Sequence, residues 1–323
     1  MNIKCCWLMT VLLAASMMIG QVHADCPAVC NCKWKGGKET VECAYRNLTW
    51  LPQGAREETQ VLDLSGNHLV ELRKDGFKDL HLVNLQKLYL SKSNISHISP
   101  RAFTGLAGLV DLDLSSNNIR QVPSETFPSC AGLMRLILNN NPIRSLSKNA
   151  FMPLKQLTTL EISNCQLSSI QMGAFNDLPV LEWLRLNDNR LTFVPEMTLP
   201  LTTILHGLTL HNNPWVCNCR LRPLQEWLKI SAPSVPQESD PACESPPRLQ
   251  GRAVKAVKQD DLACLPEIQM GGAPVEVDEG ANVTLHCNVY AIPAATVTWT
   301  YNGEKCENHD DNEPVSPYVM SQA

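Results

Sequence analysis

The sequence lacks several features that would point to nucleic acid or to a membrane span. Basic residues are not in excess, since 27 lysines and arginines stand against 32 aspartates and glutamates, a formal net charge of −5. After the N-terminal segment, no apolar run approaches the roughly 18 residues that a membrane helix needs, and no lipidation signal stands at the C-terminus. These absences argue against a nucleic-acid partner and predict no membrane span in the chain as written.

Catalytic motifs are missing as well. The sequence has no glycine-rich phosphate loop, no His-Glu-x-x-His helix and no Gly-x-Ser-x-Gly nucleophile turn. His206 and His211 are close in sequence but have no obvious third ligand, so exposed or hydrogen-bonded histidines are favoured over a metal site. We therefore expect no enzyme activity, no cofactor and no metal.

Residues 1–24 predict a secretory signal peptide. Lys4 precedes an apolar stretch over residues 7–19, and Val22-His23-Ala24 offers small residues where a signal peptidase cleaves. The stretch of 13 residues is short for an uncleaved membrane anchor, the alternative. Cleavage after Ala24 removes Lys4 and leaves 26 basic and 32 acidic residues, a net charge of −6. We expect an extracellular, secreted chain.

Cysteines gather in two clusters. Four lie between positions 26 and 43 and four between positions 217 and 264, whereas only Cys130 and Cys165 lie between the clusters. In an oxidising compartment such clusters predict disulfides, although the same spacing in a cytosolic protein would suggest a zinc site. Sequence alone permits three pairings within each group of four.

The middle of the chain repeats the pattern L-x-x-L-x-L-x-x-N-x-L seven times. The position normally held by asparagine, here called the ladder position, recurs after 26 and then five times after 24 residues. It holds Asn67, Ser93, Asn117, Asn141, Cys165, Asn189 and Asn213. A second marker keeps this step, at Phe77, Phe103, Phe127, Phe151 and Phe175. The register predicts a leucine-rich-repeat solenoid over residues 59–213, an α/β-type repeat of short parallel strands with a mostly irregular or 3-10 convex side.

A single repeat cannot bury its own apolar face, so neighbouring repeats must stack into one core. We expect the strand leucines to point inward, the phenylalanines to fill the interior from the convex side, and the ladder asparagines to bond backbone groups of the adjacent turn. Ser93 and Cys165 depart from asparagine. Because cysteine is tolerated at this position of the pattern, we interpret Cys165 as a buried, unreactive thiol outside any disulfide.

The residues that alternate with the core leucines should point to the concave face. They form a mixed set: Lys87 and Tyr89, Asp111 and Asp113, Arg135 and Ile137, Thr159 and Glu161, Trp183 and Arg185, and Thr209 and His211. Paired acids such as Asp111 and Asp113 can serve catalysis, but an open solenoid surface implies no substrate pocket. We interpret these two carboxylates as solvated or partner-facing.

Within this set we predict a partner-binding surface formed by Tyr89, Arg135, Ile137, Glu161, Trp183 and Arg185. Tyr89, Ile137 and Trp183 are expected to be exposed apolar anchors, and Trp183 is the first choice, because tyrosine, tryptophan and arginine dominate protein interfaces. The alternative is an ordinary solvated surface on which Arg135 and Glu161 only pair with each other.

After Cys264 the leucine period ends. We expect a linker over residues 266–274 and then strands, because alternate residues from Val275 to Cys287 are apolar. Cys287 and Trp299, with a hairpin turn at Asn302-Gly303, resemble strands B and C of an immunoglobulin sandwich. Cys306 follows the tryptophan too closely to be the second core cysteine. We expect a partial all-β domain over residues 275–305 and a disordered tail over residues 306–323.

The cysteine clusters resemble the disulfide caps of extracellular leucine-rich-repeat proteins, here over residues 25–58 and 214–265. Cys26-x3-Cys30-x-Cys32-x10-Cys43 resembles the N-terminal cap, which implies Cys26–Cys32 and Cys30–Cys43 disulfides. The run from Asn213 through Cys217 and Cys219, followed by Trp227-Leu228, Cys243 and Cys264, resembles the C-terminal cap, which implies Cys217–Cys243 and Cys219–Cys264. Caps of this kind cover the open ends of a solenoid.

The order of modules is similar to that of the kekkon family of insect surface proteins. The similarity includes Pro246-Pro247-Arg248-Leu249-Gln250-Gly251, Leu262-Ala263-Cys264-Leu265-Pro266 and Asn282-Val283-Thr284-Leu285. Kekkon proteins are usually single-pass plasma-membrane proteins whose ectodomains modulate growth-factor receptors or mediate neuronal contacts. The resemblance implies an extracellular protein partner of one of these kinds. Without the membrane helix, the chain as written suggests a soluble antagonist.

Two function classes stay open. A recognition module that modulates a receptor or adhesion partner is favoured by the C-terminal cap and the immunoglobulin strands, and a secreted structural protein of the extracellular matrix is the alternative. Three N-glycosylation sequons, at Asn47, Asn94 and Asn282, fit a secreted surface in either class.

Overall fold

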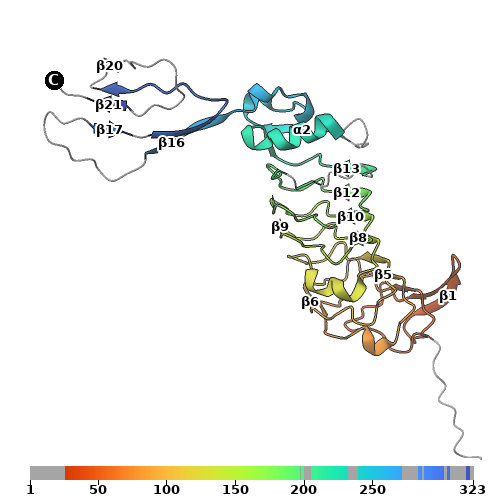
Figure 1. Cartoon of the computed structure of the whole chain (residues 1–323). Helices are drawn as coiled ribbons and strands as arrows, with labels where there is room; N and C mark the ends of the chain where they lie inside the picture. Colours follow the sequence, from red (N-terminus) through yellow and green to blue (C-terminus); the bar gives the residue numbers. More distant parts are fainter. Residues whose placement is uncertain are drawn as a thin grey trace, which may run out of the picture. The chain divides into compact units, whose positions relative to one another are not determined.

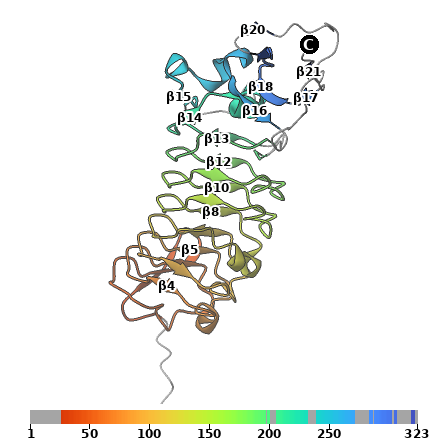
Figure 2. The same ribbon diagram turned by 90° about the vertical axis from the view of Figure 1, so that its left-hand side faces the viewer.

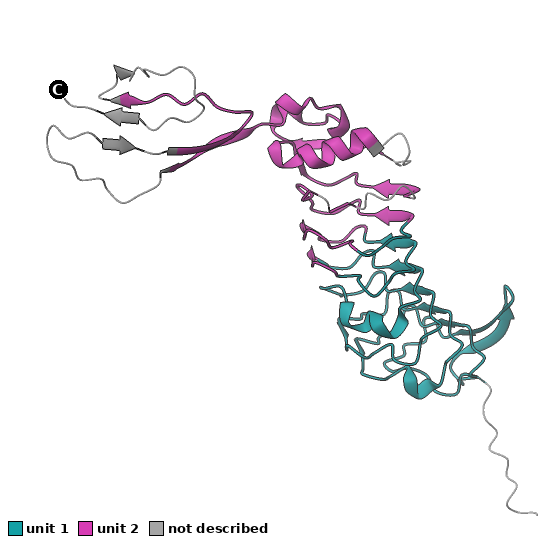
Figure 3. Cartoon of the chain, viewed as in Figure 1, with its two compact units in different colours: residues 1–143, 150–162, 177–181 teal, residues 144–149, 163–176, 182–323 magenta. Residues whose placement is uncertain are grey.

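The structure is a computed structural model of the chain (Figure 1). It describes residues 26–196, 198–199, 205–231, 239–270, 283–285, 287–301, 304–305 and 318–320. The predicted signal peptide, Asn282 and Cys306 lie outside these residues. Contacts divide the chain into two compact units (Figure 3), which are described one at a time: Met1–Ile143 with Ala150–Ile162 and Asp177–Leu181, and Arg144–Asn149 with Ser163–Asn176 and Glu182–Ala323.

In the first unit, each repeat contributes one short parallel strand. These strands are β3 (Val61–Asp63), β5 (Lys87–Tyr89), β7 (Asp111–Asp113), β8 (Arg135–Ile137) and β10 (Thr159–Glu161). The cap hairpin, β1 (Asn31–Lys35) and β2 (Lys38–Glu42), extends the sheet in the order β1-β2-β3-β5-β7-β8-β10. Figure 2 shows β5, β8 and β10 stacked in this way. The central residue of every repeat strand is a leucine and points into the core.

The convex side of the first unit is made of short pieces, as the repeat pattern predicts. β4 (Glu71–Leu72) pairs in parallel with β6 (His97–Ile98), and 3-10 turns form η1 (Lys78–Leu80) and η2 (Ser124–Cys130). In Figure 1, β6 lies across the coil from β5. Such tight turns let the convex side close each coil in few residues.

The second unit contains the last repeat strands and the C-terminal cap. β9 (Ser145–Leu146) pairs with β11 (Ser169–Ile170), and β12 (Trp183–Arg185) pairs with β13 (Gly207–Thr209). The cap comprises β14 (Trp215–Val216), η3 (Cys219–Leu221), α2 (Arg222–Ser231), β15 (Cys243–Ser245), η4 (Pro247–Leu249), η5 (Val254–Ala256) and η6 (Gln259–Asp261). With these strands, all seven predicted repeats carry their expected strand.

The core consists of the repeated leucines and the phenylalanine markers. Phe77, Phe103, Phe127, Phe151 and Phe175 are each at most 3% exposed. The rings of Phe77 and Phe103 lie 6.0 Å apart, centroid to centroid. The predicted burial of the five phenylalanines is confirmed. Burial of one such side chain stabilises the fold by about 1.5–3 kcal/mol.

The ladder asparagines bond the backbone of adjacent turns, as expected. The side-chain oxygen of Asn117 accepts hydrogen bonds from the backbone N–H groups of Ser93 and Ile95, both at 3.0 Å. Its amide donates to the carbonyls of Leu90, at 2.8 Å, and Leu114, at 2.9 Å. Each ladder asparagine thus satisfies buried backbone groups that would otherwise lose their hydrogen bonds.

The two departures from asparagine are both buried. The Ser93 hydroxyl donates to the carbonyl of Leu64 at 3.0 Å, which takes over part of the asparagine's role. Cys165 is 8% exposed, and Cys130 is fully buried. Neither cysteine takes part in any of the four disulfides. Burial raises the pKa of the Cys130 thiol to about 12, which keeps it protonated and unreactive.

A second repeated feature was not predicted. The residue before every ladder position has left-handed backbone, with φ between 50° and 69°, at Gly66, Lys92, Ser116, Asn140, Asn164, Asp188 and Asn212. Glycine, asparagine and aspartate tolerate this conformation best and fill five of the seven positions. That composition was the sequence signal for the turn.

The structure contains the four disulfides that the family resemblance implies. They are Cys26–Cys32 and Cys30–Cys43 in the N-terminal cap, and Cys217–Cys243 and Cys219–Cys264 in the C-terminal cap. Beneath the second cap, Trp215 is fully buried and its indole N–H donates to the carbonyl of Leu210 at 3.1 Å. The caps therefore cover apolar surface at the ends of the repeats.

Beyond the second cap, two predicted boundaries are wrong. Residues of the expected linker belong to β16 (Cys264–Met270), which pairs with β18 (Cys287–Ile292). Within the expected disordered tail, β21 (Tyr318–Met320) pairs with β17 (Val283–Leu285). Strand β16 was not predicted because it contains Pro266, and proline is unusual within a strand. The predicted hairpin is confirmed by β19 (Thr300–Tyr301) and β20 (Glu304–Lys305).

Candidate partner-binding surface

In the first unit, the strand register places the concave side chains in two rows. The first row contains Lys87, Asp111, Arg135 and Thr159, and the second contains Tyr89, Asp113, Ile137 and Glu161. Neighbours within a row lie on adjacent strands and are close enough to interact. Charge therefore alternates in sign along the first row, from lysine to aspartate to arginine.

Asp111, which we expected to be solvated or partner-facing, is buried and therefore not solvated. It is 7% exposed, and the Lys87 ammonium lies 3.8 Å from one of its oxygens. The other oxygen is buried and has no hydrogen-bond partner in the part of the chain that the structure describes. Burial raises the pKa of the Asp111 carboxyl, although the charges of Arg135 and Lys87 oppose this effect. In the sheet register, Asp111 lies between Lys87 and Arg135, which both have long side chains.

Arg135 and Glu161 form the ion pair that the alternative interpretation predicts. The guanidinium lies 3.1 Å from one Glu161 oxygen, and the Asn139 amide donates to the other at 2.9 Å. Arg135 is still exposed, so the pair is worth about 0–1 kcal/mol. The pairing orients the arginine without removing it from the surface.

The predicted exposure of Ile137 is wrong. Ile137 is only 8% exposed, because this short side chain lies between Asp113 and Glu161 on the adjacent strands. Tyr89 is half-buried, and burial, assisted by the charge of Asp111, raises the pKa of its hydroxyl. In this unit, Tyr89 is the partly accessible aromatic of the predicted set.

In the second unit, Trp183 is held above a glycine. Trp183 on β12 is the register partner of Gly207 on β13. A Cβ atom added at Gly207 would lie 2.4 Å from two carbons of the indole ring, so the ring occupies the space that a side chain at position 207 would fill. The indole is nevertheless 42% exposed. Gly207 therefore creates a platform for an exposed aromatic ring, a role that sequence reasoning missed.

The other concave residues of this unit are less accessible. Thr209 is 5% exposed, and its hydroxyl donates to the Asn187 side chain at 2.7 Å. Arg185 and His211 are half-buried. The amide of Asn212 donates to Asp188 at 2.8 Å, and this hydrogen bond lowers the pKa of the aspartate. These residues form a polar border next to Trp183.

Neither predicted histidine joins a metal site among the described residues. His206 lies 3.7 Å from Glu182 at the surface, and no group of three histidine, cysteine or acidic side chains that could hold a metal occurs in the described ranges. No described helix is long and apolar enough to cross a membrane.

Comparison with known families agrees with this fold. A leucine-rich-repeat model matches residues 57–119, 108–167 and 155–214, a leucine-rich-repeat C-terminal domain model matches residues 240–265, and an immunoglobulin domain model matches residues 266–321. The chain therefore contains leucine-rich repeats, a disulfide-bonded C-terminal cap and an immunoglobulin-like domain. Proteins with these domains are typical of protein–protein recognition, in adhesion or signalling.

Two curated relatives illustrate the similarity. Human leucine-rich repeat, immunoglobulin-like domain and transmembrane domain-containing protein 2 is 36% identical over 96 residues, 29% of this chain and 17% of that protein. The mouse platelet glycoprotein Ib beta chain is 39% identical over 89 residues, 27% of this chain and 43% of that protein. The chain thus spans less than half the length of each.

Among solved structures, human 5T4, also called Wnt-activated inhibitory factor 1 or trophoblast glycoprotein, is similar with a TM-score of 0.57 and 29% identity. The match covers 74% of this chain and 99% of that one. The matched domain families and these relatives are consistent with the prediction that this chain is not an enzyme.

Proposed function

We propose that this chain is an extracellular recognition protein that binds a cell-surface protein through its concave strand face and modulates signalling or adhesion. The observation that carries the proposal is Trp183, an exposed indole whose position is fixed by Gly207. Large aromatic side chains supply much of the affinity in protein interfaces. A ring that is already held in place loses little conformational freedom when a partner binds.

The first unit supports the same proposal with polar groups. Arg135 is exposed and oriented by Glu161, while Tyr89, two strands from Arg135 in the sheet, is partly accessible. Oriented charges discriminate between partners more than they add affinity. We propose Tyr89, Arg135 and Glu161 as contact residues of the first unit, and Trp183 and Arg185 as contact residues of the second. The burial of Ile137 removes it from the set.

The class of partner follows from the resemblance to the kekkon family. It favours a growth-factor receptor or an adhesion protein, and a secreted form of the chain would act as a soluble antagonist. The similarity to human 5T4, which also carries the name of an inhibitory factor, supports a modulating role. A structural protein of the matrix is the alternative.

A binding screen tests the proposal. The secreted chain, fused to an antibody Fc region, is measured by surface plasmon resonance against growth-factor receptor ectodomains, adhesion ectodomains and collagen. We expect Trp183→Ala to weaken receptor or adhesion binding at least about fivefold. Met172→Ala provides the control, because Met172 is 61% exposed but lies away from β12 and β13, next to β11. Unchanged affinity for Trp183→Ala would overturn the concave-face proposal, and binding to collagen alone would favour the matrix role.

A further inference from the structure

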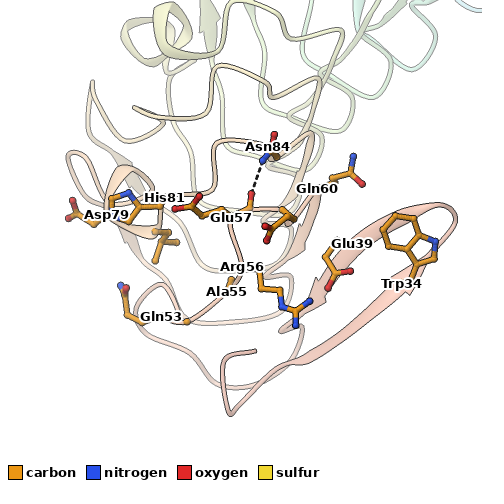
Figure 4. Close-up of a pocket in the computed structure, with 13 residues that line it drawn as sticks. Trp34, Glu39, Gln53, Ala55, Arg56, Glu57, Gln60, Asp79, His81 and Asn84 are labelled. Atoms are coloured by element: carbon orange, nitrogen blue, oxygen red, sulfur yellow. Dashed lines mark hydrogen bonds between the residues drawn. The ribbon is translucent and has the colours of Figure 1, made fainter. Parts of the chain in front are cut away.

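The N-terminal cap contains a groove that belongs to neither row of concave side chains. Its volume is about 1130 Å³. Three segments line it (Figure 4): the β1–β2 hairpin, the loop over residues 53–58, and the chain from Asp79 to Asn84. Pockets for small molecules usually hold roughly 300–1,000 Å³, so this groove has room for a short stretch of polypeptide.

Hydrogen bonds fix the walls of the groove. The Asn84 amide donates to the backbone carbonyl of Glu57 at 3.1 Å, which ties the loop to the segment after η1 (Figure 4). On the other side, the backbone N–H of Gln60 donates to the carbonyl of Glu39 at 2.9 Å. The groove is therefore built into the cap and does not depend on a flexible loop closing.

The groove is acidic. Glu39, Glu57, Glu58 and Asp79 line it, against the single guanidinium of Arg56 and the imidazole of His81. None of the four carboxylates is in an ion pair within the described ranges. The lysines of the hairpin bond other groups, and the Lys38 ammonium donates to the side-chain oxygen of Gln86. Lys33 and Lys35 alternate with Trp34 along β1 and pair with Glu42 at 2.7 Å and 2.9 Å.

Trp34 supplies an aromatic wall to this acidic groove. It is the register partner of Glu39 in the hairpin and is 70% exposed. The face of an indole attracts lysine and arginine side chains through cation–π interactions. Carboxylates and an exposed indole around one groove favour the same kind of ligand, a chain segment that carries basic side chains.

We infer that this groove binds an extended basic segment of a partner protein, with one arginine or lysine stacked on Trp34 and others facing Glu57, Glu58 and Asp79. This surface is independent of the concave-face contact at Trp183. A partner could use it in addition to the concave face, and its loss would leave the concave-face contact intact.

The inference is tested with a fluorescein-labelled peptide of alternating arginine and glycine, whose anisotropy is followed as the secreted chain is added. We expect Trp34→Ala to weaken binding about three- to fivefold through the lost cation–π contact. Trp50→Ala is the matched control, since Trp50 is 72% exposed but does not line the groove. We expect it to leave the affinity unchanged.

The role of charge is tested in parallel with two variants of equal net charge. Glu57→Gln/Glu58→Gln should weaken binding about threefold or more, whereas Glu71→Gln/Glu125→Gln removes the same two charges from exposed positions outside the groove and should have little effect. Thermal melting checks that each variant is folded. Equal weakening by both charge variants, no effect of Trp34→Ala, equal binding of an alternating glutamate–glycine peptide, or no binding of the arginine peptide would each overturn the inference.

Discussion

The interior ladder and the concave face repeat with the same steps of 24 or 26 residues but differ in their chemistry. The ladder repeats asparagine at five of seven positions, with buried serine and cysteine at the others. At the sequence position that forms the first concave row, the residue changes at every repeat, from valine to lysine, aspartate, arginine, threonine, tryptophan and glycine. Positions that must satisfy identical backbone groups keep one solution, whereas positions facing outward are free to differ. The difference separates residues that form the fold from residues that can recognise a partner.

The ladder is expected to give the largest loss of stability. Asn117→Ala removes side-chain hydrogen bonds to five backbone groups, those of Ser93, Ile95, Leu90, Leu114 and Ser115. Leaving such buried groups unsatisfied costs at least about 3 kcal/mol in the free energy of unfolding. Asn118→Ala, at the exposed neighbouring position, should change stability by less than about 0.5 kcal/mol. Urea unfolding measures the free energy of unfolding of both variants. Equal losses would show that the ladder hydrogen bonds do not stabilise the fold more than an exposed asparagine does.

The platform under Trp183 should give the next largest effect. Gly207→Ala places a methyl group 2.4 Å from the indole and should destabilise the fold by about 1–3 kcal/mol while moving the ring. Partner affinity should then fall as far as in Trp183→Ala. Gly132→Ala is the control, because its nearest neighbour atom would be 3.8 Å away. If Trp183→Ala/Gly207→Ala is not more stable than Gly207→Ala alone, the ring does not rest on the glycine.

Asp111 is an exception to the difference between the ladder and the concave face, because it lies on the concave face but is buried like a core residue. Its folded pKa is raised, so the ionised carboxylate destabilises the folded chain at pH values above that pKa. The cost disappears as the pH falls below the unfolded value near 3.9. Asp111→Asn should therefore stabilise the chain by about 1 kcal/mol at pH 7 and by less at pH 4. Unfolding of both proteins at the two pH values measures this, and destabilisation at pH 7 would show that Lys87 and Arg135 outweigh burial.

The smallest effect should come from the Arg135–Glu161 pair. A double-mutant cycle with Arg135→Met and Glu161→Gln should give a coupling energy of about 0.2–1 kcal/mol, because the arginine is exposed. The coupling should decrease in high salt. A coupling well above this range would mean that the pair belongs to the fold and not to the recognition surface.

The sequence predicted the repeats well because their signal is regular. The seven strands, the buried phenylalanines and the ladder bonds each follow from a position that recurs. The concave face was harder to predict, since exposure there depends on neighbours 24 residues away. Ile137 is buried by the side chains beside it, and Asp111 lies between two long cations, neither of which local pattern reveals.

Two further features required three-dimensional information. Gly207 looks like an ordinary variable residue until its register with Trp183 is known. The N-terminal groove joins segments from the hairpin to Asn84 that share no sequence motif. The start of β16 was missed for a local reason, because Pro266 and the short apolar alternation after it resemble a linker.

The central claim is that outward-facing residues carry recognition while the repeated interior carries the fold. It is tested most directly by measuring partner affinity and the free energy of unfolding on the same Trp183→Ala protein. We predict that affinity falls at least about fivefold while stability changes by less than about 1 kcal/mol. Unchanged affinity together with a large loss of stability would contradict the claim and would make Trp183 part of the fold.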